Sequence, residues 1–329
     1  MERRRFGKTG LDLSVLGFGC GAVGGLMVKG TAADQERGVA RALQMGINYF
    51  DTAPSYGDGL SERNLGRVLG TLRPDVVVGT KVRLADAERG HVAEAVAASL
   101  EASLRRLGRE RVDLLQLHNP ITRDGRARTL DVATVEQVVA ALEKLRQQGK
   151  IRFAGITALG DTNALHRVID MRVFDTAQVC YNLLNPSAGQ PVPPGFPAHD
   201  FGQLLTRARA ADMGTMNIRV LAGGALSGEE GRHPHGVPVV EPIASGTDYA
   251  ADVRRGRRFD ALVREGHAGS VVEASLRFAI ANPAMTTVLV GYSTLDQLEY
   301  AAAAIAKGPL PRAALDQLPG LWRDVAETV

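Results

Sequence analysis

The fold is decided by residues 76–117, VVVGTKVRLADAERGHVAEAVAASLEASLRRLGRERVDLLQL. This stretch begins and ends with short apolar runs, 76–79 and 113–117, which are typical of buried strands. Between the runs, apolar residues recur at spacings of three and four and predict an amphipathic helix; they are Val92, Val96, Leu100, Leu104 and Leu107. A strand, a helix and a second strand in this order form one crossover unit of a parallel sheet covered by helices.

The same alternation runs through the rest of the chain. Six further apolar runs predict strands: VLGF (15–18), INYF (47–50), FAGI (153–156), TAQVC (176–180), TMNIRV (215–220) and TVLV (287–290). Eight strands joined by helix-length crossovers in 329 residues favour an α/β architecture of one (β/α)8 TIM barrel over two doubly wound domains. Because no interdomain linker interrupts the pattern, we predict a single barrel domain over residues 1–329.

Three segments add to this barrel. FGKTGLDLS at 6–14 predicts an N-terminal β-hairpin. ALDQLPGLWRDVAETV at 314–329 carries an apolar stripe and predicts an extra C-terminal helix docked on the barrel. Two connections, about 185–200 and 223–256, are long for a compact domain, and such loops usually act as lids or binding loops.

Composition excludes several classes of protein. Hydrophobic residues make up 45% and charged residues 23%, which rules out disordered and fibrous chains. Since no long apolar run occurs, we expect no membrane span, no secretory signal and a cytoplasmic location. The net charge of +3 is too small to indicate a nucleic-acid partner. The two cysteines, Cys20 and Cys180, are expected to be free thiols in a reducing compartment.

Polar residues at the ends of neighbouring strands point to a reaction centre. Asp51, Lys81 and His118 follow three successive predicted strands, and Tyr56 lies in the loop after Asp51. In a barrel of this type the active site lies at the carboxyl ends of the strands, so these tips should converge. An ammonium paired with Asp51 would lower the pKa of a nearby phenol, which could then exchange protons near neutral pH. Taken one at a time, each of these residues is more simply explained by a structural role, such as an ion pair or a buried polar group. The occurrence of all four at adjacent strand ends favours an active site.

These residues lie in segments that resemble the aldo-keto reductase family over nearly the whole chain. The resembling segments are FGKTGLDLSVLGFG (6–19), NYFDTAPSYGDGLSERNLGRVL (48–69), GTKV (79–82), VDLLQLHNP (112–120), IRFAGIT (151–157), AQVCYNLLNP (177–186), LAGGALSG (221–228) and VLVGYSTLDQLEYA (288–301). The resemblance implies an oxidoreductase that uses NADP or NAD to interconvert carbonyls and alcohols. It implies Tyr56 as general acid or base, Lys81 and Asp51 as residues that tune it, and His118 as a residue that places the carbonyl.

The same resemblance implies a set of cofactor-binding residues. Thr157 and Gln178 would hold the nicotinamide carboxamide, and Ile218 occupies a position where many relatives stack an aromatic ring. Arg219 and Leu221 fall in the pyrophosphate-binding loop. The adenosine-phosphate segment would use three residues, Gly291, Ser293 as a helix N-cap and Gln297 in place of a frequent arginine. Without that arginine, we expect use of both NAD and NADP. Closing a barrel mouth over a dinucleotide also requires a segment that can reach across it, and the stretch from about Ser227 to Arg258 is the longest candidate, so we expect it to be poorly ordered without cofactor.

Two motifs have competing interpretations. Gly19, Gly21 and Gly24 spell G-x-G-x-x-G, but a Rossmann site needs a helix to begin on that turn, and the first helical signal comes only at Thr31. We therefore interpret Gly19 and Gly21 as a loop that lets the cofactor approach the first strand. The pair His233 and His235 lacks a third ligand, so we expect no metal site.

The substrate is predicted to be a small carbonyl compound or alcohol, including sugars. Residues expected to line its site are Phe18, Leu26, Met27 and Asn119. Two alternatives remain at this stage: a cofactor-binding regulatory subunit of the same family, and a barrel lyase that uses Lys81 as a Schiff-base amine. The second needs a lysine without a carboxylate neighbour, which Asp51 contradicts. We expect a monomer or small homo-oligomer.

Overall fold

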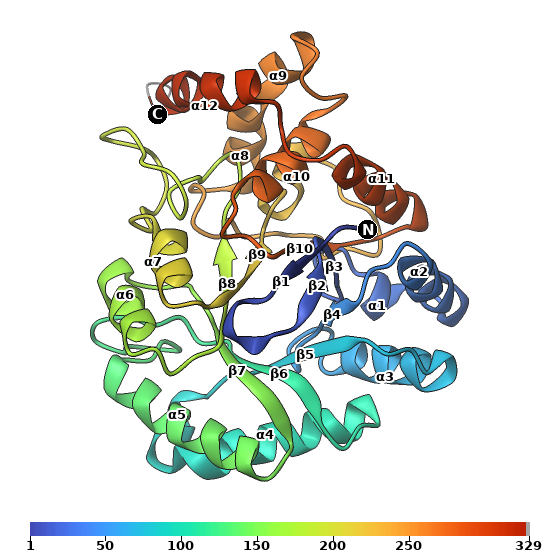
Figure 1. The fold of residues 1–329 in the computed structure, drawn as a ribbon, viewed down its shortest axis with the longest axis vertical. Helices are drawn as coiled ribbons and strands as arrows, with labels where there is room; N and C mark the ends of the chain where they lie inside the picture. The colour runs from blue at the N-terminus through green and yellow to red at the C-terminus, as the bar shows by residue number, and fades with distance from the viewer. Residues whose placement is uncertain (327–329) are drawn as a thin grey trace.

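A computed structural model describes residues 1–326 and contains a closed parallel barrel (Figure 1). All eight predicted strands are present, and each pairs with its neighbours so that β10 closes against β3 and β9. In barrel order the strands are β3 (Leu16–Gly19), β4 (Tyr49–Asp51), β5 (Val77–Val82), β6 (Val112–Leu117), β7 (Ile151–Thr157), β8 (Thr176–Cys180), β9 (Gly214–Ile218) and β10 (Thr287–Gly291). The (β/α)8 prediction is therefore confirmed, and the doubly wound alternative is wrong.

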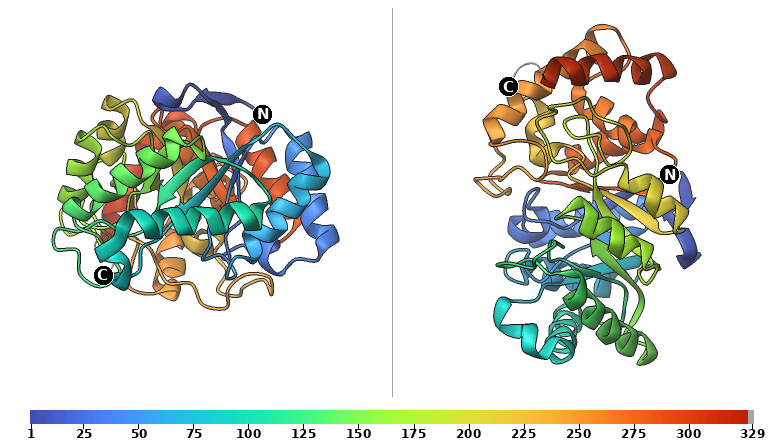
Figure 2. Two further views of the ribbon diagram at one scale, coloured as in Figure 1. Left: turned by 90° about the horizontal axis from the view of Figure 1, so that it is seen from below. Right: turned by 90° about the vertical axis from the view of Figure 1, so that its left-hand side faces the viewer.

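Helices follow the strands and cover the outside of the barrel (Figure 2). The main ones are α2 (Ala32–Gln44), α3 (Leu60–Leu72), α4 (Val92–Leu107), α5 (Val132–Gln147), α6 (Thr162–Asp170), α7 (Leu204–Ala210), α10 (Val271–Ala281) and α11 (Leu295–Ala306). Local chemistry sets several of their starts. The side chains of Thr31 and Asp131 each accept a hydrogen bond from a backbone N–H of the first turn of α2 and α5, respectively.

Four shorter or additional helices complete the chain. They are α1 (Leu26–Lys29), α8 (Tyr249–Gly256), α9 (Asp260–Arg264) and α12 (Arg312–Ala326), with 3₁₀ turns at Gly7–Thr9, Asp86–His91, Ala222–Ser227 and Arg257–Phe259. The predicted terminal helix is confirmed as α12, which buries Leu318, Trp322 and Val325; residues 327–329 of the predicted segment lie outside the described residues. The Trp322 indole N–H donates to the Leu183 backbone oxygen at 3.0 Å and fixes the helix on the loop after β8. The single turn α1 begins earlier than the first predicted helix.

The N-terminal hairpin closes one end of the barrel. Its strands, β1 (Arg3–Arg5) and β2 (Asp12–Ser14), pair antiparallel as predicted. Phe6 and Leu13 are fully buried in the same interior cluster as Tyr49, Leu114 and Met216. This cluster fills the barrel, so the interior is a packed core rather than a channel. The hairpin lies across one end of the barrel, and the long segment before α8 lies at the other (Figure 2).

The two long loops are tied together at this second end. Arg255 of α8 donates to the Pro197 backbone oxygen at 3.2 Å and to the Ser245 backbone oxygen at 2.7 Å, and it pairs with the buried Asp252. One guanidinium therefore joins both predicted loops to a helix. Within residues 1–326, the structure has no helix long and apolar enough to cross a membrane.

Candidate active site

The four chemistry-bearing residues meet at the barrel end opposite the hairpin. Asp51 is the last residue of β4, Lys81 lies near the end of β5, and His118 follows β6 directly. Since neighbouring parallel strands end at the same edge, the barrel brings these tips together. Tyr56 reaches them from the loop after β4.

A buried ion pair forms the base of the site. The Lys81 ammonium contacts Asp51 Oδ1 and donates to the Thr52 backbone oxygen at 2.8 Å. The side chains are 1% and 5% exposed, so neither charge is solvated by bulk water. Burial alone lowers the pKa of Lys81, but Asp51 and Tyr56 outweigh it and raise that pKa above its ordinary value. Lys81 is therefore an ammonium at neutral pH.

Tyr56 lies against this pair. The Lys81 ammonium is 4.8 Å from the centroid of the Tyr56 ring. The sequence-based expectation that Lys81 would pull the phenol pKa below its ordinary value is wrong. Burial raises the pKa of Tyr56 by more than Lys81 lowers it, and the charge on Asp51 raises it further. At neutral pH, Tyr56 is therefore a protonated phenol beside an ammonium.

His118 faces Tyr56 from the next strand tip. The two ring centroids are 6.1 Å apart, with the rings at 87°. Burial lowers the pKa of His118 to about 3, and the positive charges of Lys81 and Arg83 add to this effect. The imidazole is therefore neutral at physiological pH and can donate a single N–H hydrogen bond.

Gln178 and Thr157 lie beside the same carboxylate. Gln178 Nε2 donates to Asp51 Oδ2 at 2.7 Å, and the Thr157 hydroxyl donates to Gln178 Oε1 at 3.2 Å. The Tyr49 hydroxyl donates to the same Asp51 oxygen at 2.9 Å. Sequence reasoning missed Tyr49, since an apolar strand residue carries no signal of its own; its position two residues before Asp51, on the same strand face, was the available sign.

The glycine-rich loop after β3 lies directly against the loop after β10. A Cβ on Gly24 would lie 2.3 Å from the Gly291 carbonyl carbon, and one on Gly19 would lie 2.9 Å from the Val290 oxygen. A Cβ on Gly21 would meet only the Tyr56 ring, at 3.7 Å. The loops after β3 and β10, both of which the resemblance assigns to the cofactor, are therefore neighbours. Gly21 presents only backbone to the Tyr56 ring.

The start of α11 differs from the prediction. Thr294, rather than Ser293, caps this helix, because its hydroxyl accepts from the Gln297 backbone N–H at 3.3 Å and its backbone is extended. The Ser293 hydroxyl donates to the Gly24 backbone oxygen, and its N–H donates to Gln297 Oε1 at 2.7 Å. Ser293 therefore joins the two loops instead of capping the helix.

The end of β9 carries an arginine in a strained backbone conformation. Arg219 has a φ of 58°, and the backbone oxygen of this residue accepts from Asn182 Nδ2 at 2.8 Å. Its guanidinium contacts the Glu241 backbone oxygen at 3.3 Å, has no carboxylate partner within residues 1–326, and has its pKa lowered by burial. Ile218 and Leu221 flank it and are partly buried. An unpaired, half-buried cation suits an anionic ligand group.

Two residues expected to line the substrate site, Phe18 and Asn119, instead pack in the core or bond to the backbone. Phe18 has no exposed surface and packs on Phe50 and Tyr292, with ring centroids 5.4 and 5.2 Å apart. Strand alternation turns it outward to the helix layer, because Gly17 and Gly19 face the barrel axis. The Asn119 amide is fully buried and bonded to the backbone of Leu84 and Arg128. Met27 is buried in α1, and Leu26 is 3% exposed.

Residues 228–248 form a strap over the glycine-rich loop. Arg232 donates to three backbone oxygens, those of Val23, Gly223 and Val237, at 3.0, 2.9 and 2.8 Å. His235 Nδ1 lies 2.9 Å from the Ser293 backbone oxygen. The strap therefore joins the loops that follow β3, β9 and β10, as a segment covering the predicted cofactor site would.

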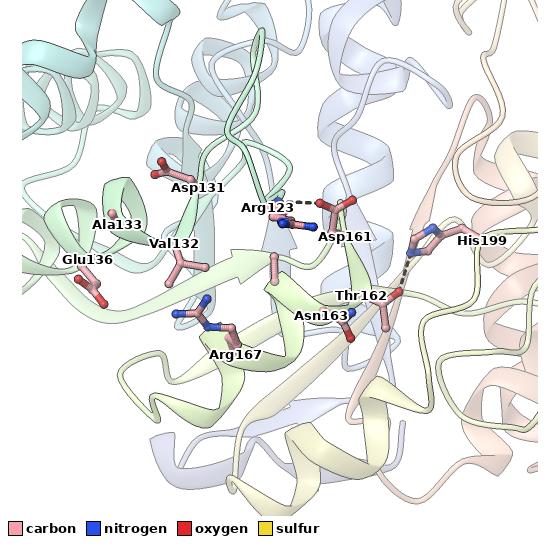
Figure 3. Close-up of a pocket in the computed structure, with 11 residues that line it drawn as sticks. Arg123, Asp131, Val132, Ala133, Glu136, Asp161, Thr162, Asn163, Arg167 and His199 are labelled. Carbon is pink, nitrogen blue, oxygen red and sulfur yellow. Dashed lines mark hydrogen bonds between the residues drawn. The ribbon is translucent and has the colours of Figure 1, made fainter.

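One cavity lies outside this mouth, between the first turns of α5 and α6 (Figure 3). It measures about 910 Å³ and is lined by charged and polar side chains, among them Arg123, Glu136, Asp161, Arg167 and His199. It is not lined by Asp51, Tyr56, Lys81 or His118. Because its lining carries charges of both signs and none of those four residues, we place the candidate site at the barrel mouth. No cluster of three potential metal ligands occurs within residues 1–326.

The chain is similar to known proteins in its sequence and in its fold. The chain matches the sequence model of the Aldo/keto reductase family over residues 15–323. L-galactose dehydrogenase from Arabidopsis thaliana is 31% identical over 317 residues, covering 93% of this chain and 89% of the plant protein. D-threo-aldose 1-dehydrogenase from a Pseudomonas species is 30% identical, covering 97% and 95%. An aldo-keto reductase from Bacillus halodurans, in its holo form, superimposes with a TM-score of 0.70 at 24% identity over 100% of this chain and 97% of that one.

Proposed function

Because the chain belongs to the aldo/keto reductase family, we propose that it is an NAD(P)-dependent oxidoreductase that interconverts carbonyl compounds and alcohols. The observation that carries the proposal is the buried ion pair of Asp51 and Lys81 beneath the Tyr56 ring, with a neutral His118 beside it. Two of the relatives are named for sugars, so aldoses are the substrate class to test first.

The residues at the mouth suit a dinucleotide. The backbone of Gly21 is open beside Tyr56, while Gly19 and Gly291 hold the loops after β3 and β10 in close contact. The cofactor-binding set is completed by Thr157, Gln178, Ile218, Arg219, Leu221, Ser293 and Gln297. Among these, the unpaired Arg219 guanidinium offers charge to a diphosphate. When bound, the nicotinamide supplies or accepts a hydride at the substrate carbon.

Residues of the protein transfer the proton to and from the substrate oxygen. In reduction, the Tyr56 hydroxyl donates its proton to the carbonyl oxygen as negative charge develops there, and in oxidation the phenolate removes it. Lys81 stabilises the phenolate, and Asp51 keeps the ammonium charged and in place. His118, being neutral, donates a hydrogen bond that holds the substrate oxygen within reach of Tyr56.

Substitution of Tyr56 by phenylalanine tests the proposal. This change keeps the ring and deletes the transferable proton, so kcat should fall by about 10² to 10⁴, while the Kd for NAD(P) measured by fluorescence titration changes little. Reductase and dehydrogenase assays with a panel of aldehydes and aldoses identify the substrate. Near wild-type turnover in Tyr56→Phe would assign the proton to another group, and no turnover by the wild type would favour a regulatory subunit.

A further inference from the structure

The Asp51 carboxylate receives more donors than an ion pair requires. Its Oδ1 contacts Lys81, while its Oδ2 accepts from the Tyr49 hydroxyl at 2.9 Å and from Gln178 Nε2 at 2.7 Å. The proposed function accounts for Lys81 as a tuning group and for Gln178 as a cofactor ligand. It gives no task to the Tyr49 hydroxyl.

The barrel builds a place for the Tyr49 phenol. The side chain has no exposed surface and lies within the interior apolar cluster. Glycines on the two flanking strands leave room for it: a Cβ on Gly79 would lie 2.6 Å from the Tyr49 hydroxyl, and one on Gly17 would lie 3.3 Å from its ring. A phenylalanine would fill nearly the same volume and avoid burying a hydroxyl. Packing therefore does not explain the hydroxyl, whose acceptor is Asp51.

We propose that Tyr49 is a positioning residue for proton transfer, whose hydroxyl orients the Asp51 carboxylate and withdraws charge from it, and so sets how strongly Tyr56 holds its proton. The inference rests on the proposed role of Tyr56. With Tyr49 and Gln178 on Oδ2, the carboxylate presents Oδ1 to Lys81 in one orientation. A hydrogen bond to a carboxylate stabilises its charge locally, so less negative potential reaches the phenol.

The other titratable groups around Asp51 keep their protonation states across the pH range of the assay. The Cys20 thiol faces Asp51 but is neutral, because burial and Asp51 raise its pKa. Tyr49 itself remains a donor, because burial and Asp51 raise its pKa well above the ordinary value. Lys81 remains charged, as described above.

The groups around Tyr56 are equally constant. Arg219 adds a fixed positive charge near the phenol. His118 is neutral above about pH 5, because burial, Lys81 and Arg83 lower its pKa to about 3. If a Tyr49 variant changes the proton affinity of Tyr56, the change therefore reflects the charge and orientation of the Asp51 carboxylate, because no other neighbouring group gains or loses a proton in this range.

Tyr49→Phe tests the inference. Without the donor, Asp51 carries more charge towards Lys81 and Tyr56, which disfavours the phenolate. We expect the pH at which the oxidation rate rises to move up by about 0.5 to 1 unit, and kcat below that pH to fall by about three- to tenfold. In the Tyr56→Phe background the same change should have no further effect. Tyr181→Phe is the matched control: Tyr181 is a buried tyrosine that stacks on Phe278 of α10, outside the site, and this variant should leave the profile unchanged.

A second variant reverses the expected sign. A difluorotyrosine at position 49 keeps the shape and is a stronger donor, so it should move the profile down; it also serves if Tyr49→Phe does not fold. The onset of titration of the Tyr56 ¹³Cζ resonance, assigned with Tyr56→Phe, should move in the same directions without any turnover. Unchanged profiles and resonances in both variants, or shifts of the same sign, overturn the inference. A normal resonance shift in a protein that turns over no substrate would contradict the proposed function alone.

Discussion

Replacing Lys81 by methionine probes the energetics of the buried pair. Methionine fills a similar volume, so the main effect is a carboxylate, Asp51, left without its cation at 5% side-chain exposure. Breaking a buried pair from one side costs about 3 to 5 kcal/mol. Two hydrogen bonds remain on Asp51, from Tyr49 and Gln178, so we expect the lower end, about 3 kcal/mol in the free energy of unfolding at pH 8.

The loss should depend on pH in a defined direction. In the Lys81→Met variant a buried carboxylate without a cation favours its protonated form, so its pKa in the folded state exceeds that in the unfolded state. The folded variant therefore binds the extra proton, and its stability relative to the wild type recovers as the pH falls from 8 to about 5. Urea unfolding at several pH values measures this directly.

Two controls isolate the ion pair. The double variant Lys81→Met, Asp51→Asn removes both charges, so its stability should lie closer to the wild type than that of Lys81→Met. Lys150→Met breaks a pair with Glu101 whose side chains are 36% and 39% exposed, and should cost at most about 1 kcal/mol. The reasoning is refuted if Lys81→Met unfolds at the same urea concentration as the wild type at pH 8, or if the double variant is no more stable than the single one.

Three further predictions concern the mouth. Because the pKa of His118 is lowered to about 3, the pH profile of kcat/KM should show no step from His118 between pH 5 and 8. His118→Gln should therefore lower kcat/KM without shifting the profile. A step near pH 6.5 that the variant abolishes would contradict this prediction. Arg232→Ala removes three hydrogen bonds from the strap, so it should speed proteolysis within 228–248 and weaken the protection that NAD(P) gives. The control Arg254→Ala, on the exposed face of α8, should do neither. Equal cleavage of the wild type with and without cofactor would argue against a lid. The Kd values for NAD and NADP should lie within a thousandfold, and Gln297→Arg should favour NADP by about ten- to a hundredfold through a charge-assisted hydrogen bond; no change would place the 2′-phosphate elsewhere.

The sequence by itself determined the barrel and the identity of the strand-tip residues. Hydrophobic periodicity located all eight strands, because a buried parallel strand must be continuously apolar and its crossover helix must carry one apolar stripe. Once the barrel was inferred, Asp51, Lys81 and His118 had to share one end, since each follows its strand in the same direction. The extra C-terminal helix was equally visible, because its apolar stripe needed a surface to cover.

Only the tertiary structure decided the contacts that tune this site. Gln178 and Asp51 are 127 positions apart and meet through closure of the barrel, and the Tyr49 hydroxyl becomes meaningful only beside Asp51. Phe18 turned away from the mouth, because strand register, not residue type, selects the face. The pKa of Tyr56 rose where the residue list suggested a fall, since burial outweighed the neighbouring ammonium. Local pattern follows from backbone periodicity, whereas desolvation and the pairing of distant side chains depend on how the whole chain packs.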